Sequence, residues 1–188
     1  LIMAGLVYSN TQKLEKPGRQ VDRQIPLELR GKGYPWVSRG GLKLDHGLSH
    51  FSIDVTGATC LDIGVSTGGF TDVLLTRGVS KVYAVDVGYA QLDWKLRQDE
   101  RVIVLERTNA RHLTLGHVPE PISFLCCDAS FIGLKVVLPA SMELVSEDGH
   151  LIALIKPQFE VGKGNLGKRG VVSDSDLHKS VCSNILDW

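Results

Sequence analysis

Between residues 59 and 188, short apolar runs alternate with helical patterns, and this alternation constrains the fold more than any other feature of the sequence. Each apolar run has the length of a buried strand, and the segments between the runs are long enough for helices. Strands joined through helices form right-handed βαβ units in a parallel sheet with helices on both faces. We therefore predict an open α/β fold with a mostly parallel sheet. The expected strands are 59–63, 81–85, 101–105, 122–127 and 151–155, and the expected helices are 70–76, 92–98, 134–145 (closed by Gly149) and one that starts at 174.

The segment before this alternation is basic and rich in turn residues. Residues 1–45 contain eight Lys or Arg and four Asp or Glu, whereas residues 46–154 contain eight bases and thirteen acids, within a chain whose net charge is zero. A basic segment before an acidic body indicates a polyanionic partner, and a solvated face is the alternative interpretation. We expect a small hairpin that joins Val7-Tyr8 to Gln20-Val21, a glycine-rich linker at 31–41 and a short amphipathic helix from Leu42 to Phe51.

The composition is that of a globular protein and excludes several classes. With 43% hydrophobic and 22% charged residues, the chain is neither disordered nor collagenous, and no apolar run is long enough to span a bilayer. Cys60, Cys126 and Cys127 lie in apolar runs and no metal-ligand spacing appears, so we expect reduced thiols, a cytoplasmic location and no metal. The first residues do not form a signal peptide, and because position 1 is not Met we expect a fragment.

In open parallel sheets, ligands bind beyond the carboxyl ends of the strands. A loop of Gly, Ser and Thr follows the first predicted strand, and its glycines permit a tight turn and a close backbone approach to a ligand. Asp86 follows the second strand, 22 residues after Gly64, which suits an acid that binds ribose hydroxyls. Because Ser66 breaks the G-x-G-x-x-G pattern, a single nucleoside-like ligand is favoured over a dinucleotide, and a tight turn with a surface Asp is the alternative.

Two further polar residues follow strands, and a third precedes the fold. Asp128 ends the fourth predicted strand and Lys156 the fifth, so we expect both to face one crevice, and Lys43 lies on the helix that leads into the fold. A Lys and Asp set of this kind can hold and deprotonate a hydroxyl nucleophile. A structural ion pair between Asp128 and Lys156, and a solvated Lys43, are the alternatives.

Residues 162–169 nearly match a phosphate-binding P-loop. Arg169, however, stands where that motif needs Ser or Thr, and the segment does not follow a strand directly. We therefore reject nucleotide hydrolysis and expect a mobile basic loop that contacts phosphates through Lys163, Lys168 and Arg169.

Six sequence blocks follow one another along the chain: Ser38–Leu44, Asp62–Asp72, Val85–Tyr89, Arg107–Arg111, Asp128–Ile132 and Lys156–Glu160. Together they resemble the TlyA (so-called hemolysin A) family of S-adenosylmethionine-dependent RNA 2′-O-methyltransferases, which is related to the FtsJ methyltransferases. The resemblance implies a Rossmann-like methyltransferase domain at 42–188 that lacks its last two strands, and at 1–30 the remnant of an RNA-binding module.

The resemblance also implies a role for each candidate site residue. Lys43, Asp128 and Lys156 match three members of a catalytic Lys-Asp-Lys-Glu set, whose Glu has no counterpart here. The residues implied in S-adenosylmethionine binding are Asp62, Gly64, Ser66, Thr67, Gly68, Gly69, Phe70, Asp86, Val87, Thr108 and Asn109; those expected to contact RNA are Lys13, Lys16, Arg19, Arg39, Lys163, Lys168 and Arg169.

The partner implied by the resemblance is ribosomal RNA or a ribosomal subunit, with no membrane and no metal. Three alternatives remain open at this point: a non-enzymatic RNA-binding or ribosome-assembly factor with a vestigial cofactor site, a membrane-damaging protein, and an NAD-dependent oxidoreductase. Block five favours an oxygen acceptor, because Asp128-Ala129-Ser130-Phe131 lacks the Pro-Pro typical of enzymes that methylate base amines.

Overall fold

A computed structural model describes residues 2, 5–30, 34–162, 164, 166–167 and 170–188. The chain divides into two compact units, Leu1–Pro35 and Trp36–Trp188. Residues 1–35 of the basic segment therefore lie in a unit of their own, whereas Arg39 and Lys43 belong to the second unit.

The first unit contains a three-stranded antiparallel sheet. Its strands are β1 (Val7–Ser9), β2 (Gln12–Lys13) and β3 (Glu28–Leu29), in the order β2-β1-β3. A tight turn joins β1 to β2, and Asn10 occupies the left-handed region there with φ 52°, which Asn tolerates better than most residues. The expected hairpin with Gln20-Val21 is wrong, because this turn brings Gln12-Lys13 beside β1 instead.

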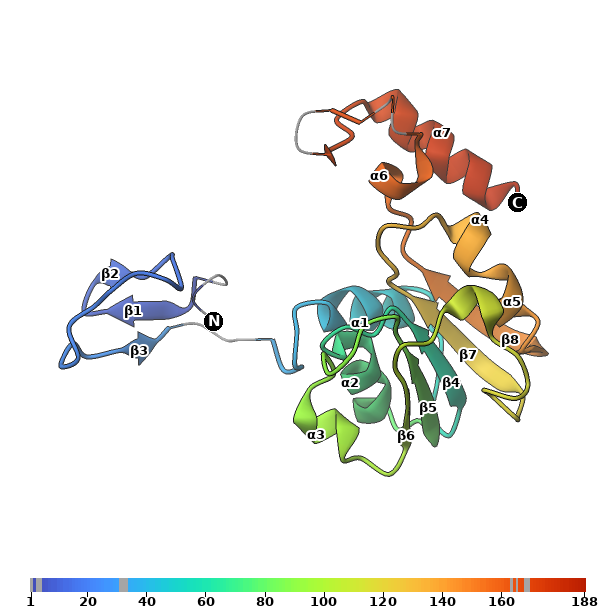
Figure 1. Ribbon diagram of the computed structural model, residues 1–188, viewed down its shortest axis with the longest axis horizontal. Helices are drawn as coiled ribbons and strands as arrows, with labels where there is room; N and C mark the ends of the chain where they lie inside the picture. The colour runs from blue at the N-terminus through green and yellow to red at the C-terminus, as the bar shows by residue number, and fades with distance from the viewer. Residues whose placement is uncertain (1, 3–4, 31–33, 163, 165, 168–169) are drawn as a thin grey trace. The chain divides into compact units, whose positions relative to one another are not determined.

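The second unit is built on a five-stranded parallel sheet. Its order is β6-β5-β4-β7-β8, and every neighbouring pair is parallel. The order reverses between β4 and β7, which makes this position the topological switch point. Figure 1 shows the sheet and its helices. The strands are β4 (Thr59–Ile63), β5 (Lys81–Val85), β6 (Val102–Leu105), β7 (Ile122–Cys127) and β8 (Val145–Ala153).

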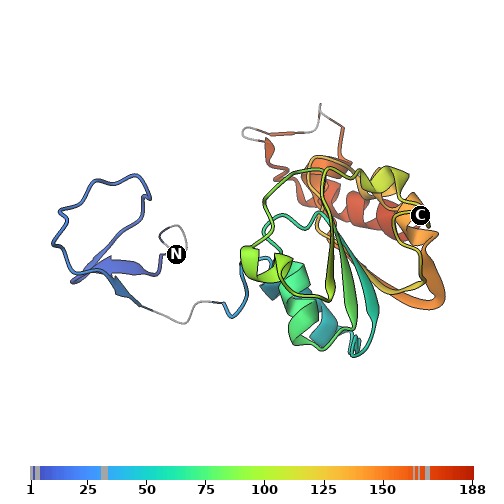
Figure 2. The ribbon, with the colours of Figure 1, turned by 60° about the horizontal axis from the view of Figure 1, so that its bottom comes forward.

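Two hydrophobic cores lie on opposite faces of this sheet, and the ribbon in Figure 2 shows helices on both sides of it. The first holds side chains of α1 (Gly41–His50), α2 (Gly69–Thr76) and α3 (Trp94–Arg97), and the second holds those of η1 (Ala110–His112) and α4 (Leu134–Val137). The neighbours Cys126 and Cys127 lie in the first and second core respectively, as expected for adjacent strand residues. The remaining helices are α5 (Pro139–Met142), α6 (Pro157–Glu160) and α7 (Ser175–Leu186).

Most expected elements are confirmed, but the segment from 134 to 155 differs. The single helix expected at 134–145 is two short helices, because Pro139 has no N–H to donate to the carbonyl of Lys135. Strand β8 runs from Val145 to Ala153 rather than from 151 to 155, with an irregular register between Ile122 and Phe124, so Gly149 lies inside a strand and closes no helix. Lys156 therefore lies three residues beyond the strand rather than directly at its end.

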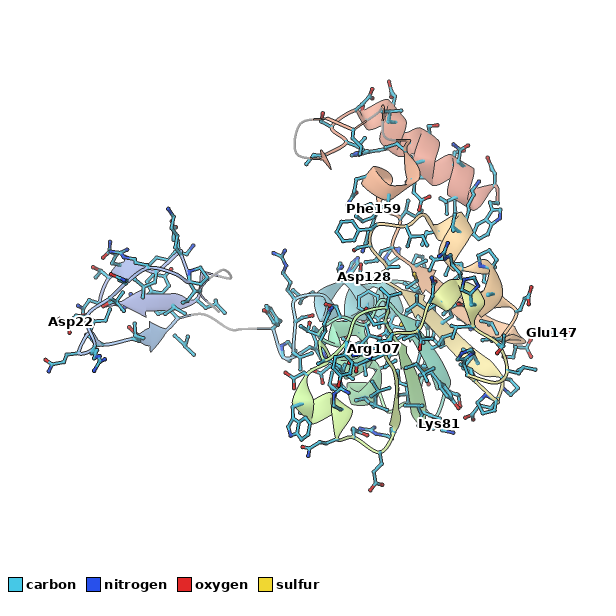
Figure 3. The ribbon with its side chains drawn as sticks, in the orientation of Figure 1. Asp22, Lys81, Arg107, Asp128, Glu147 and Phe159 are labelled. Carbon is cyan, nitrogen blue, oxygen red and sulfur yellow. The ribbon has the colours of Figure 1, made fainter. Side chains whose placement is uncertain are left out.

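The strands end in register, and this alignment positions the residues that follow them. Ile63 pairs with both Val85 and Cys127, so Gly64, Asp86 and Asp128 occupy the next row at one edge of the sheet. Figure 3 shows Asp128 near this end and Lys81, the first residue of β5, at the opposite end.

At the switch point, the loop that follows β4 packs tightly against the loop that follows β7. Gly64 has φ +80°, and a Cβ there would lie 2.8 Å from the Cα and 2.9 Å from the backbone N of Ala129. Because the obstacle is backbone, no rotamer change relieves it. Glycine is therefore required here by the packing of the two loops, whatever ligand they bind.

No helix in the part of the chain that the structure describes combines the length and the apolar character needed to cross a membrane.

We expect Gly64→Ala to destabilise the protein much more than Gly57→Ala. Both positions have positive φ, but a Cβ at Gly57 meets nothing within 4 Å, so the two variants share the backbone cost and differ in the clash. The additional loss in unfolding free energy should be about 1–3 kcal/mol, as for other overpacked sites. Urea unfolding of both variants measures it, and equal losses would show that the Ala129 contact is unimportant.

Candidate active site at the carboxyl ends of the strands

The glycine-rich loop turns sharply from β4 into α2. Gly68 is the N-cap of α2 with φ +96°, and a Cβ there would lie 2.7 Å from a methyl group of Leu92. Ser66 also has a positive φ, 51°. A serine held in a conformation that favours glycine is strained, and such strain gathers at functional sites.

Asp86 holds this loop in place. Its Oδ2 accepts a hydrogen bond from the backbone N of Ser66 at 2.8 Å, and its Oδ1 accepts one from the backbone N of Gly88 at 2.7 Å. The carboxylate therefore joins the loop after β4 to the loop after β5. Each oxygen keeps a second lone pair for a ligand hydroxyl.

A cavity of about 450 Å³ opens beside Asp86. That volume lies within the range of about 300–1,000 Å³ typical of small-molecule sites. Its lining combines apolar side chains with a few polar groups from the ends of β4, β5, β6 and β7, including Ser66, Asp86, Val87, Thr108 and Asn109. We call it the first cavity.

Asp128 forms the centre of a charged cluster. Its Oδ2 pairs with Lys43 Nζ, and its Oδ1 lies 2.6 Å from Lys156 Nζ. Lys156 also donates hydrogen bonds of 3.0 Å to the backbone O of Asp128 and to Ser130 Oγ. The side chains of Asp128 and Lys156 are 19% and 18% exposed, whereas that of Lys43 is 46% exposed. The ion pair between Asp128 and Lys156 is therefore sheltered, and Lys43 reaches Asp128 from the solvent side.

This cluster borders a second cavity of about 680 Å³. Lys43 and Lys156 line it together with Arg39 and the start of the glycine-rich loop, so its walls are basic. The first and second cavities share four lining residues, Gly64, Ser66, Asp128 and Ser130. Two ligands, one in each cavity, would therefore meet beside the Asp128 carboxylate.

The segment from Trp36 to Gly40 packs on the second unit and carries Arg39 to the second cavity. The backbone N of Val37 donates a 2.8 Å hydrogen bond to Asp72 Oδ2, and Lys95 Nζ lies 2.9 Å from the same oxygen. A Cβ at Gly41 would lie 2.8 Å from the Trp36 ring, so the indole packs against the first turn of α1.

Asp62 lies beneath the site as a fully buried carboxyl group. Thr71 Oγ1 donates a 2.7 Å hydrogen bond to its Oδ2, while its Oδ1 has no hydrogen-bond partner among the described residues. Burial raises the pKa of Asp62 to about 7, partly offset by the hydrogen bond from Thr71. Asp62 therefore holds a proton in the folded protein at pH values where an exposed Asp is ionised.

The structure distributes the predicted site residues over both cavities and the core. Gly64 and Ser66 line both cavities, whereas Thr67, Gly69 and Phe70 line only the second. Asp62 and Gly68 line neither cavity, because the first is buried and the second packs under Leu92 and Leu96.

The predicted RNA-contact residues fall into three groups. Arg39 lines the second cavity, and Lys13, Lys16 and Arg19 line a separate hollow of about 390 Å³ in the first unit. Lys163, Lys168 and Arg169 lie outside the described residues. No group of three or more His, Cys, Asp or Glu side chains suited to a metal occurs in the part of the chain that the structure describes.

Sequence reasoning assigned no role to Ser130, Phe131 or Gln91, although all three line the first cavity. Ser130 and Phe131 belong to the block Asp128–Ile132, and their position directly after a predicted strand is the signal that could have identified them as cavity residues. Phe131 has φ 65° and is 90% exposed, an unusual backbone conformation for an aromatic residue. Gln91 lies in a loop and had no recognisable pattern.

We expect Asp62→Asn to remove a pH-dependent loss of stability. The folded-state pKa of about 7 lies above the ordinary value of 3.8, so the folded state keeps a proton that the unfolded chain releases, and stability falls as pH rises from about 4 to about 7. Relative to the wild type, the variant should gain up to about 1.4 kcal/mol per pH unit across that window.

Urea unfolding of both proteins at pH 5, 6 and 7 measures this difference. Asp148→Asn, at an exposed position on β8, is the matched control and should show a constant difference from the wild type. A constant difference for Asp62→Asn would contradict the raised pKa.

The model of the FtsJ-like methyltransferase family matches residues 36–188, which is the whole second unit. A solved structure of a candidate hemolysin from Streptococcus thermophilus superposes with a TM-score of 0.84 at 43% identity, covering 99% of this chain and 68% of that one.

Curated relatives agree with this match. The 16S/23S rRNA (cytidine-2′-O)-methyltransferase TlyA of Mycobacterium tuberculosis is 55% identical over 178 residues, covering 94% of this chain and 66% of that protein. Hemolysin A of Brachyspira hyodysenteriae is 37% identical over 187 residues, covering 99% of this chain and 78% of its own length. The chain thus spans about two thirds of the TlyA protein. The resemblance inferred from the six blocks is confirmed: this chain belongs to the FtsJ-like methyltransferase family.

Proposed function

We propose that this protein transfers a methyl group from S-adenosylmethionine to a ribose 2′-hydroxyl of ribosomal RNA. The observation that carries the proposal is the Lys43-Asp128-Lys156 cluster at the junction of the two cavities. The TlyA relative of Mycobacterium tuberculosis, an rRNA (cytidine-2′-O)-methyltransferase by name, supports the choice of acceptor.

The first cavity fits a nucleoside-like donor. Its Asp86 carboxylate keeps free lone pairs for ribose hydroxyls, and Thr108 and Asn109 offer polar groups beside apolar walls that suit a purine ring. Gly64 and Ser66, which line both cavities, would lie at the methionine end, together with the buried Asp62 below them. S-adenosylmethionine would supply a methyl group on a positively charged sulfur.

The second cavity fits the acceptor. Arg39, Lys43 and Lys156 give it a positive charge that would attract an RNA phosphate and the ribose attached to it. Methyl transfer needs the acceptor oxygen in line with the donor methyl, so positioning is the main task of these residues. Lys156 would bind the ribose hydroxyl and help to remove its proton, while Asp128 and Lys43 hold Lys156 and the hydroxyl in place.

The first unit supports binding to the RNA. Lys13, Lys16 and Arg19 line one hollow together with Gln12 and Glu15, and Arg19 donates a hydrogen bond to Gln12 at 3.5 Å. Three cations against one acid give this hollow a net positive charge. We assign it to phosphate contacts, with residues 1–30 as an RNA-binding module and 42–188 as the methyltransferase domain. A cytoplasmic location follows from this proposal, because ribosomes are the substrate.

Lys156→Ala should lower methyl transfer to rRNA by at least about 100-fold, the lower range for loss of a general base. Binding of S-adenosylmethionine should change little, because Lys156 does not line the first cavity, to which the nucleoside part of the cofactor is assigned. Transfer of a labelled methyl group to rRNA and calorimetry with the cofactor measure the two effects. Lys135→Ala, at an exposed position on α4, is the matched control and should keep full activity.

The acceptor atom is tested separately with RNA that carries a 2′-deoxy nucleotide at the methylated position. Methylation should disappear, and its survival would exclude the ribose hydroxyl as acceptor. Cofactor binding without any transfer by the wild-type protein would instead favour an RNA-binding or assembly factor.

Replacing Lys13, Lys16 and Arg19 together by Gln should weaken RNA binding without changing cofactor binding. Each lost phosphate contact reduces the dependence of log affinity on log salt concentration by about 0.9 for a duplex and about 0.7 for a single strand. Titrations of rRNA at several salt concentrations measure the slope. Replacing Arg23 and Arg30, which do not line the hollow, is the control and should leave most of the slope intact.

A further inference from the structure

The short helix α6 contacts the loop that follows β7 at two separate places. Lys156, its N-cap, contacts Asp128 and Ser130, while Glu160, its last residue, accepts a 2.8 Å hydrogen bond at Oε1 from the backbone N of Leu134. Both ends of this four-residue helix are therefore attached to the segment that follows β7. The attachment at Glu160 involves none of the residues assigned above to catalysis or to cofactor binding.

Two further contacts bring the same elements together. A Cβ at Gly133 would lie 2.8 Å from Glu160 Oε2 and 3.3 Å from the carbonyl O of Phe159. The rings of Phe131 and Phe159 lie 5.2 Å apart, and Figure 3 shows Phe159 on the α6 side of the Asp128 site. The loop thus meets α6 at its beginning, its middle and its end.

Backbone geometry connects Lys156 to the rest of α6. Pro157 fixes the first helical residue, and the backbone N of Phe159 donates a 2.8 Å hydrogen bond to the carbonyl of Lys156. A rigid helix turn held at Glu160 leaves its N-cap little freedom to move away from Asp128. Without the Glu160 hydrogen bond, the contacts among the described residues that still join α6 to the loop are those of the Lys156 side chain, the two phenylalanine rings, and Gly133 with the Phe159 carbonyl.

We propose that Glu160 is a positioning residue that holds Lys156 against Asp128, and that Gly133 is glycine so that Glu160 can approach. We call this contact the Glu160 latch. The proposal rests on the proposed function, because it assigns Glu160 a part in the same methyl transfer. Glu160 itself lines neither cavity.

The main test compares Glu160→Ala with Glu160→Gln. The Ala variant loses the acceptor for the Leu134 amide, whereas Gln keeps an oxygen at the same reach. We expect kcat to fall about 10- to 100-fold in the Ala variant, the cost of misplacing a catalytic group by about 1 Å. The Gln variant should retain most of kcat, and the affinity for S-adenosylmethionine should be unchanged in both.

Gly133→Ala provides an independent test, because Gly133 has φ −79° and ψ 152°, a conformation open to alanine. The added methyl group should push Glu160 away and lower kcat in the wild-type background. In the Glu160→Ala background it should cost much less, because the nearest obstacle has gone. Additive losses would contradict the latch. Glu147→Ala, at an exposed position on β8, is the control and should keep full activity.

A readout without catalysis separates this proposal from the proposed function. The rate at which an amine-reactive reagent labels Lys156, followed by mass spectrometry, should rise in Glu160→Ala and stay near the wild-type rate in Glu160→Gln. If the wild type binds the cofactor and transfers no methyl group, the proposed function fails, and this labelling still decides the latch. Unchanged labelling and kcat in Glu160→Ala, or a loss of thermal stability with kcat intact, would overturn it.

Discussion

The contact between Gly64 and the backbone of Ala129 is the constraint on which the rest of the site depends. It lies where the strand order reverses, between β4 and β7, and it brings the loops that follow these two strands within van der Waals distance. Gly64 also lines both cavities, so this contact lies where they meet. A side chain here would push the loops apart and increase the distance between any cofactor and its acceptor.

Charge is divided between the two cavities in a way that suits a transfer reaction. The first cavity has Asp86 in its wall and the second has Arg39, Lys43 and Lys156, while Asp128 is common to both. A cationic donor is therefore favoured on one side and an anionic polymer on the other. The raised pKa of Asp62 fits this division, because a neutral acid beneath the loop avoids a second buried negative charge near Asp128.

The sequence predicted much of this architecture because buried parallel strands are nearly continuous apolar runs. Strands β4, β5 and β7 were placed to the residue, and the row that holds Asp86 and Asp128 followed from their ends. Strand β8 was misplaced at its start, because Ser146 to Gly149 have low strand propensity and lie between Val145 and His150, which are the residues that pair with β7. Short-range patterns carry no information about such pairing.

Sequence patterns are equally uninformative about which single side chains of the site contact one another. That Lys43 and Asp128 meet was an expectation from the family resemblance, since 85 positions separate them along the chain. The Leu134 amide that binds Glu160 offered no sequence signal at all, because any residue except proline supplies it. Residue type identifies groups capable of proton transfer, whereas the contacts that position them involve backbone atoms common to every residue. The supporting contacts of a site such as this one therefore become visible only in three dimensions, even where its charged residues can be named from the sequence.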